Sequence, residues 1–179
     1  MRPLLTLAAA LAPLVPAAAP AQEVFAGAYV HGVDTPFTLY TGEDGTDIEL
    51  GYRFAPIKAL HALGSPSPYL IGSVNTVGDT SFAGVGLDWR FSLKGPLYVR
   101  PGVGVVVHDG PSYRVDHARH EETDLGSRVL FEPELGLGYQ LDPKFSLEAS
   151  WTHISQGRLF NAHQNPGIDM WGVRANYRL

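Results

Sequence analysis

The chain contains no cysteine. This absence excludes disulfide-stapled scaffolds, thiol nucleophiles and cysteine-based zinc or iron–sulfur sites. Charge is also sparse, since only 17% of the residues are charged and the formal net charge is -5. An acidic chain gives no basic field for nucleic acid, which is therefore not an expected partner. The 20 glycines and 14 prolines are scattered, which makes long helices improbable, and 45% hydrophobic residues are too many for a disordered chain.

Long apolar runs are missing beyond the N-terminus. Residues 1–21 begin with the basic Arg2, continue with an apolar stretch from Leu4 to Val15 and end in the small residues Ala19-Pro20-Ala21. That order is typical of a cleaved secretory signal, and the prolines that interrupt it argue against a membrane-spanning helix. We therefore expect export, followed by a single mature domain over residues 22–179. This domain is expected to be either a soluble periplasmic protein or a β-barrel in the membrane.

Alternation of apolar and polar residues is the main signal in the mature chain. From Leu97 to His108 the odd positions are all leucine, valine or proline, whereas the even positions include an arginine and two glycines. The pattern repeats from Arg128 to Leu141, where Arg128, Glu132 and Glu134 share the minority face. Successive side chains of a strand point to opposite faces, so each segment predicts a strand with one apolar face.

A soluble barrel would show the same alternation with its apolar face turned inward. The composition of the two faces favours the membrane, because glycines and charges of both signs suit a narrow interior, whereas large apolar and aromatic residues suit lipid. The sequence thus predicts an all-β fold, an eight-stranded antiparallel transmembrane β-barrel of the outer membrane. The expected strands are roughly 24–31, 46–54, 68–76, 80–91, 97–108, 126–141, 145–155 and 168–179.

The connections predict the orientation of the barrel. Short turns at 92–96 and 142–144 are expected on the periplasmic side, and long loops at 32–45, 109–125 and 156–167 on the outer side. The 55–67 connection is longer than a periplasmic turn should be. Inside the barrel we expect a structural ion-pair network made of Glu49, Arg53, Asp88, Arg90, Arg100, Arg128, Glu132, Glu134, Glu148 and Arg174.

Three polar residues interrupt the lipid-facing stripe at the outer end. The parity of Trp151 continues to His153 and Ser155, and the parity of the next strand puts Asp169 on the same face. Residues two apart on a strand are roughly 6 to 7 Å apart between Cα atoms. Histidine as a base for serine, with a carboxylate to orient it, is a recurrent catalytic arrangement. The alternative is that these side chains only mark where the strand leaves the bilayer.

The sequence around these residues resembles a known family. His153-Ile154-Ser155, followed by Asn165-Pro166-Gly167-Ile168-Asp169 and a closing strand, is similar to the motif of PagL-type lipid A 3-O-deacylases, also called acyloxyacyl hydrolases. Similarity to the wider family extends to Val74–Ser81, His108-Asp109-Gly110 and Leu125–Phe131. The resemblance implies an eight-stranded outer-membrane serine esterase. Its substrate would be lipid A of lipopolysaccharide in the outer leaflet, from which it would hydrolyse the 3-O-linked acyl ester and release a fatty acid.

The same resemblance assigns roles to individual residues. Ser155 corresponds to the nucleophile, His153 to the base and Asp169 to the orienting acid. Asn165 corresponds to an oxyanion-hole donor, and the backbone N–H of Gly157 is a second candidate. Two positions depart from the family: Gln156 replaces the usual asparagine, and Asp169 stands where the best-known members have glutamate.

Other readings remain open at this point. A structural or adhesion barrel without activity is the main alternative to the esterase, and an acyltransferase would need an acceptor site that the sequence does not display. One long loop is rich in metal-ligand residue types, but it lacks a helical context and a defined third ligand, which favours a solvated loop. These residues are His108, Asp109, His117, His120, Glu121 and Glu122. No metal or organic cofactor is expected, and the sequence does not indicate an oligomeric state.

Overall fold

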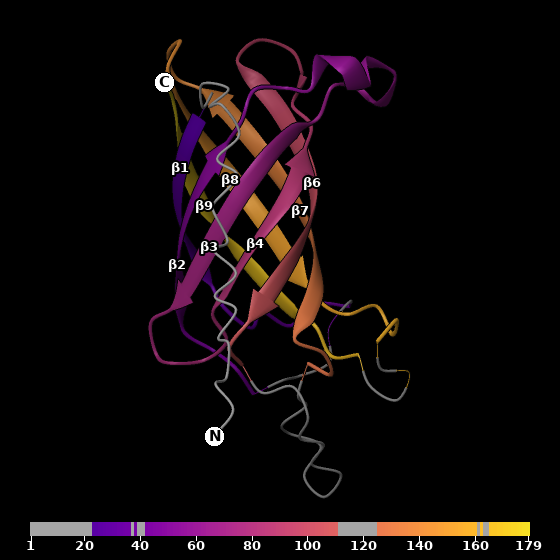
Figure 1. The fold of residues 1–179 in the computed structure, drawn as a ribbon. Helices are drawn as coiled ribbons and strands as arrows, with labels where there is room; N and C mark the ends of the chain where they lie inside the picture. Colours follow the sequence, from indigo (N-terminus) through magenta and orange to yellow (C-terminus); the bar gives the residue numbers. More distant parts are fainter. Residues whose placement is uncertain (1–22, 37, 39–41, 111–124, 161, 163–164) are drawn as a thin grey trace, which may run out of the picture.

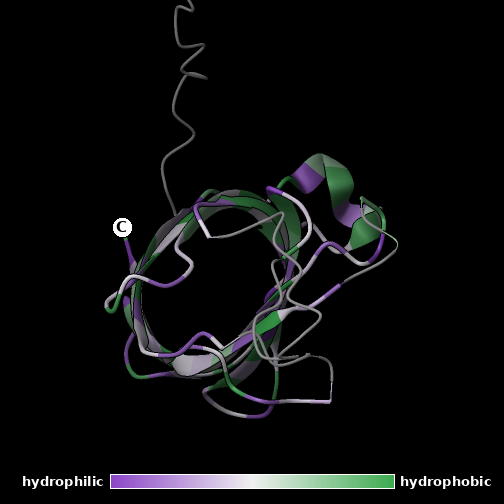
Figure 2. Ribbon diagram, turned by 90° about the horizontal axis from the view of Figure 1, so that it is seen from below, coloured by the Kyte–Doolittle hydropathy of each residue, from purple (hydrophilic) through white to green (hydrophobic). Residues whose placement is uncertain are grey.

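The protein is a closed antiparallel β-barrel (Figure 1). The computed structural model describes residues 23–36, 38, 42–110, 125–160, 162 and 165–179. Within these residues, nine strand segments follow one another along the sheet, and β4 also pairs with β6, which closes it. Viewed along its axis, the sheet forms a ring (Figure 2). The segments are β1 (Glu23–Val30), β2 (Thr46–Arg53), β3 (Ser67–Asn75), β4 (Phe82–Asp88), β5 (Phe91–Ser92), β6 (Leu97–His108), β7 (Val129–Gln140), β8 (Phe145–Ile154) and β9 (Ile168–Arg178).

These nine segments make eight barrel strands, as predicted. Segments β4 and β5 belong to one strand, because the register Asp88↔Gly102 continues unchanged to Phe91↔Val99. The interruption has a chemical cause: Trp89 N donates to Pro101 O at 2.9 Å, but proline has no N–H to return the hydrogen bond.

The predicted parity is confirmed along both long strands. Val107 is 58% exposed and Leu137 is 55% exposed, whereas Tyr98 is 1% and Glu132 is 0% exposed. The apolar side chains therefore face outward, toward lipid, and the polar side chains face inward. The prediction was wrong for Arg128, which is exposed just before β7 begins and donates through Nη1 to the Gly110 carbonyl at 2.6 Å. Arg128 therefore connects the two ends of the loop between β6 and β7 and does not join the interior network.

Most of the interior charges form the expected network, which also includes one residue that the sequence-based prediction omitted. Glu132 is an exception, because its carboxylate accepts from the Tyr69 hydroxyl. Glu23 accepts from Arg53 at 2.7 Å and from Arg100 at 3.0 Å. Arg100 also donates to Glu148 at 2.8 Å, and Arg174 donates to Glu134 at 2.7 Å. Removing one partner of a buried ion pair costs about 3 to 5 kcal/mol, so the pairing is what lets the barrel hold charges inside.

Part of the outer end of the interior is apolar, which the alternation pattern did not predict. Side chains from the loop-side ends of β4, β6, β7, β8 and β9 are almost fully buried and pack in one cluster, which includes Phe82, Val106, Leu130, Ile154, Ile168 and Met170. Together with the charged network, these side chains fill the lumen, as expected of an eight-stranded barrel.

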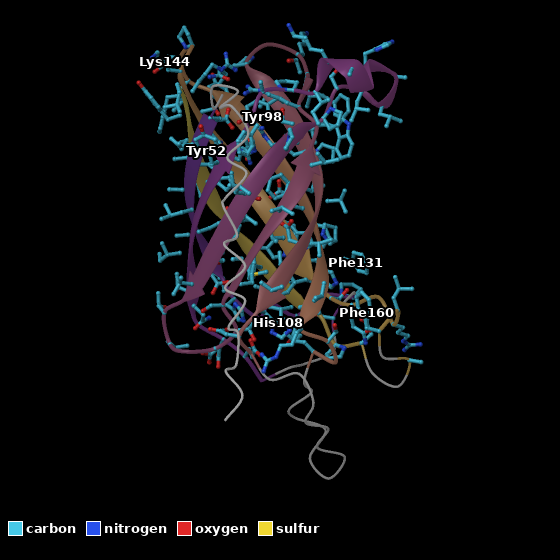
Figure 3. All side chains as sticks on the ribbon, viewed as in Figure 1. Tyr52, Tyr98, His108, Phe131, Lys144 and Phe160 are labelled. Carbon is cyan, nitrogen blue, oxygen red and sulfur yellow. The ribbon has the colours of Figure 1, made fainter. Side chains whose placement is uncertain are left out.

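The two ends of the barrel differ in their connections, as predicted. Strands β1, β6 and β8, which precede the long connections, end at the lower end in Figure 1, whereas the C-terminus and the turn at Lys144 lie at the upper end (Figure 3). Short turns mark the periplasmic side of bacterial barrels, so the lower end is the outer one.

The long 55–67 connection contains a short helix, η1 (Lys58–Leu63). Gly64, with φ of 84°, ends this helix, and Trp89 Nε1 donates to Leu63 O at 2.7 Å. Trp89 thus anchors the helix to the outside of the barrel at its periplasmic rim. Among the described residues, no helix is long and apolar enough to cross a membrane.

Two sequence-based expectations lie outside the described residues. The signal sequence expected over residues 1–21 is one of them, and most of the histidine- and glutamate-rich loop at 117–122 is the other. Both stay predictions.

One histidine ties the first outer loop to the barrel. His31, just beyond β1, has a fully buried side chain; its Nδ1 lies 2.7 Å from Asp47 Oδ2 and its Nε2 lies 3.0 Å from Glu43 Oε2. Burial lowers the pKa of His31, but hydrogen bonds to Asp47 and Glu43 outweigh it and raise the pKa to about 9. The ring is therefore doubly protonated at neutral pH and donates to both carboxylates.

We expect His31 to stabilise the protein in a pH-dependent way. The pKa of His31 is about 9 in the folded protein, and that of an unperturbed histidine is 6.5. This difference corresponds to a stabilisation of about 3 kcal/mol, which is fully present below pH 6.5 and is lost as pH rises through 9. The measurement compares the free energy of unfolding of the protein with that of His31→Gln at several pH values. The difference should shrink between pH 6.5 and 9, and a difference independent of pH would contradict the assignment.

Candidate active site

Strands β8 and β9 bring a histidine and an aspartate directly opposite each other. The antiparallel register pairs His153 with Asp169, and His153 Nδ1 lies 2.9 Å from Asp169 Oδ1. Asp169 is 0% exposed and His153 is 9% exposed, although both belong to the outward-facing parity. The aspartate therefore reaches the imidazole despite having one methylene fewer than glutamate.

Two further side chains donate to the Asp169 carboxylate. Trp151 Nε1 donates to Oδ1 at 2.8 Å, and Thr35 Oγ1 donates to Oδ2. The Trp151 ring also lies beside the His153 ring, with 6.1 Å between centroids and 25° between planes. An ionised carboxylate is an acceptor only, so this set of donors suits the ionised form of Asp169. With Nδ1 of His153 donating to Asp169, Nε2 is the ring nitrogen that can accept a proton.

Ser155 follows the last residue of β8 but keeps the geometry of the strand. Its N donates to Phe131 O at 3.1 Å, and Phe131 N donates to Ser155 O at 2.7 Å. This pairing continues the parity of His153, so the two side chains share the outward face at a Cα separation of roughly 6 to 7 Å. Ser155 is 8% exposed. Sequence parity predicts that His153, Ser155 and Asp169 share one face; the structure joins His153 to Asp169 by a hydrogen bond and places Ser155 on the same face.

Aromatic side chains adjoin the serine. The Phe131 ring stacks on Phe160, with centroids 6.0 Å apart and an angle of 12° between planes, and both lie at the outer end in Figure 3. Phe160 is 57% exposed and its neighbour Leu159 is 73% exposed. The serine therefore lies beside an exposed apolar surface.

Gly167 leaves the space that the His153 ring occupies. A Cβ atom at this position would lie 2.4 Å from His153 Cε1, 2.9 Å from Nε2 and 3.2 Å from the Ile154 carbonyl oxygen. Such contacts are too short, so any larger residue must displace the imidazole or the backbone of β8. The sequence motif contains this glycine, but only the structure explains it.

We expect Gly167→Ala to lower activity by roughly 100-fold, because a displacement of about 1 Å at a reacting group costs that much. Gly72→Ala is the matched control, since a Cβ atom there meets nothing within 4 Å. The measurement is turnover in detergent, by the two purified variants, of lipid A, the substrate that the sequence resemblance implies. Equal activity in both would show that the His153 ring does not need the space at Gly167.

The two expected oxyanion donors lie in the connection after β8. Asn165 Oδ1 accepts from Arg158 N at 3.3 Å, so the NH2 side of this amide is the one that can donate elsewhere. Gly157 has φ of 61°, a conformation that favours glycine. Their roles in catalysis stay predictions.

Gln156, the other departure from the family, belongs to the interior face. It is 0% exposed, and its Oε1 accepts from Phe160 N at 2.9 Å. Its backbone carbonyl also accepts from Leu159 N at 3.1 Å. These two hydrogen bonds fold the loop back beside the serine. We therefore assign Gln156 a structural role in this loop.

Thr35 and Trp151 were not among the predicted site residues. Trp151 was noted only as an apolar member of the strand, and Thr35 is 134 residues from Asp169 in the chain. No local motif links residues so far apart. Among the described residues, no group of three or more histidine, aspartate or glutamate side chains is placed to hold a metal ion.

These features define a class of protein: an outer-membrane β-barrel that carries a buried carboxylate–imidazole pair and a serine on its outward wall. The chain belongs to the lipid A 3-O-deacylase (PagL) family, because the sequence profile of that family matches residues 45–178. No curated protein matches the sequence significantly.

Solved structures share the fold at low sequence identity. The crystal structure of the outer membrane enzyme PagL superposes with a TM-score of 0.65 at 17% identity, covering 88% of this chain and 99% of that one. The crystal structure of Neisserial surface protein A (NspA) gives a TM-score of 0.55 at 12% identity and covers 88% of this chain and 96% of that chain. The N-terminal β-barrel domain of Pseudomonas aeruginosa OprF gives a TM-score of 0.54 at 11% identity and covers 89% of this chain and 98% of that chain. At these identities the similarity concerns the fold.

Proposed function

We propose that the protein is a serine esterase that hydrolyses the 3-O-linked acyl ester of lipid A and releases a fatty acid. The observation that carries this proposal is the hydrogen bond between His153 Nδ1 and the buried Asp169 carboxylate, on the same outward face as Ser155. Membership of the lipid A 3-O-deacylase family supplies the substrate class.

The position of the site suits a substrate that is dissolved in the membrane. Lipid A in the outer leaflet reaches only the outside of the barrel, and the three residues lie on that side at the outer end. The half-buried Phe131 ring beside Ser155, together with the exposed side chains of Leu159 and Phe160, offers an apolar surface for an acyl chain. Burying apolar atoms there would help to hold the ester near the serine.

Acylation of the serine is the first chemical step. Ser155 Oγ attacks the ester carbonyl while His153 Nε2 takes the hydroxyl proton, and Asp169 stabilises the imidazolium that forms. The Asn165 amide and the Gly157 N–H donate to the oxyanion of the tetrahedral intermediate. Collapse of this intermediate transfers the proton from His153 to the leaving 3-hydroxyl group of lipid A.

Deacylation repeats the sequence with water. His153 removes a proton from water, which attacks the acyl-serine, and the fatty acid leaves as Ser155 regains its proton. Side chains and one backbone N–H of this chain take part in these steps, and we propose no cofactor.

Mass spectrometry of lipid A tests the proposal. Cells that express the protein should contain lipid A lacking the 3-O-linked acyl chain, and cells that express Ser155→Ala should keep it. Unchanged lipid A beside correctly assembled protein in the outer membrane would instead support a structural or adhesion barrel. Loss of an acyl chain from another position would keep the esterase and contradict the 3-O specificity.

A further inference from the structure

The first outer loop closes over the carboxylate of the proposed active site. Val33 N donates to the Asp169 carbonyl oxygen at 2.9 Å, and Thr35 Oγ1 donates to Asp169 Oδ2. Both residues follow β1, which pairs with β9 along its whole length. The loop therefore reaches the aspartate from the neighbouring strand, and Asp169 is left 0% exposed.

The donors divide between the two carboxylate oxygens. Oδ1 accepts from His153 and Trp151, at 2.9 and 2.8 Å, and Oδ2 accepts from Thr35. A carboxylate held at one oxygen only can rotate about its bond to Cβ, which changes the direction of the lone pair that meets the imidazole. Donors at both oxygens oppose that rotation, because each rotated orientation breaks at least one hydrogen bond.

Thr35 is itself held in place by its own loop. Its N donates to Thr38 Oγ1 at 3.2 Å, and Thr38 Oγ1 donates to the Thr35 carbonyl oxygen at 3.3 Å. These two hydrogen bonds join Thr35 to Thr38. The hydroxyl that reaches Asp169 therefore belongs to a residue whose backbone is itself hydrogen-bonded within the loop.

On the basis of the esterase function proposed above, we propose that Thr35 is a positioning residue: its hydroxyl, together with the Trp151 indole, fixes the Asp169 carboxylate in the orientation that holds His153. Thr35 acts through Asp169 and has no contact with the ester in this role. Its effect therefore falls on the chemical step, because a misaligned base slows proton transfer while substrate binding is unchanged.

The test compares Thr35→Val with Thr35→Ser. Valine has the shape of threonine without the hydroxyl, and serine keeps the hydroxyl. A hydrogen bond to a charged group corresponds to roughly 10- to 100-fold in rate, so Thr35→Val should lower kcat on lipid A in detergent by about that factor and leave KM unchanged. Thr35→Ser should restore most of kcat. Trp151→Phe, which keeps an apolar ring, should behave like Thr35→Val.

A double-mutant cycle separates positioning from a general structural role. If Thr35 acts through Asp169, then Thr35→Val should have no further effect in a protein that already carries Asp169→Ala, in which no carboxylate remains for Thr35 to orient. An equal loss in both backgrounds would overturn the role, and so would a change in KM alone or a lowered unfolding temperature with no rescue by Thr35→Ser. Full activity of Thr35→Val beside an active wild type would overturn the positioning role only. An inactive wild type would overturn the proposed function and this role with it.

Discussion

Purified protein carrying Ser155→Ala should not hydrolyse lipid A at a measurable rate. Removing the nucleophile of a serine hydrolase lowers kcat by a factor on the order of 10⁶, because no other group forms the covalent intermediate. The backbone N–H and carbonyl of position 155 pair with Phe131 and are unchanged by the substitution. The barrel should therefore assemble normally, which unfolding temperature and extraction from outer membranes can verify.

A covalent probe makes the test independent of lipid A. A fluorophosphonate should label Ser155 in the wild-type protein, leave Ser155→Ala unlabelled and label His153→Asn far more slowly. Each member of such a unit depends on the others, so His153→Asn should lose nearly as much activity as Ser155→Ala. Equal turnover by Ser155→Ala and the wild type would remove this serine from the mechanism.

The barrel was predictable because its pattern is local. Parity along 97–108 and 128–141 requires only neighbouring residues, and it correctly placed Val107 outside and Glu132 inside. It failed for Arg128, which precedes β7 and whose guanidinium donates to the carbonyls of His108 and Gly110. It also missed the apolar outer cluster, since residues such as Leu130 and Met170 are buried by the closure of the barrel and by neighbours distant in sequence.

The candidate site was predictable only in part. Parity put His153 and Asp169 on one face, but the direct pairing of these two residues depends on the register between β8 and β9. Thr35 reaches the site from a loop that follows β1, a contact that no spacing in the sequence encodes. The interior position of Gln156 could have been read from its parity, because it is one residue beyond the outward-facing Ser155.

Replacing Asp169 by asparagine tests whether catalysis depends on Asp169 as well as on His153 and Ser155. In serine proteases this change costs about 10⁴-fold, because the histidine adopts the wrong tautomer. Here the Trp151 N–H and the His153 N–H both point at Oδ1, so the amide should keep its oxygen at that position and its NH2 group toward Thr35. The tautomer is then retained, and the loss comes from the missing charge that stabilises the imidazolium. We expect kcat to fall by roughly 10² to 10⁴.

The matched control is Asp169→Glu. Asp169 already lies 2.9 Å from the imidazole and is fully buried, so an extra methylene has no gap to bridge and must displace Thr35 or the ring. Asp169→Glu should therefore retain the charge yet lose part of its activity, about tenfold or more by misplacement. The backbone carbonyl of residue 169 still accepts from Val33 in both variants, which keeps the loop attached. Near-normal turnover of Asp169→Asn would reduce the catalytic unit to His153 and Ser155, whereas a gain from Asp169→Glu would mean that the shorter side chain limits the enzyme.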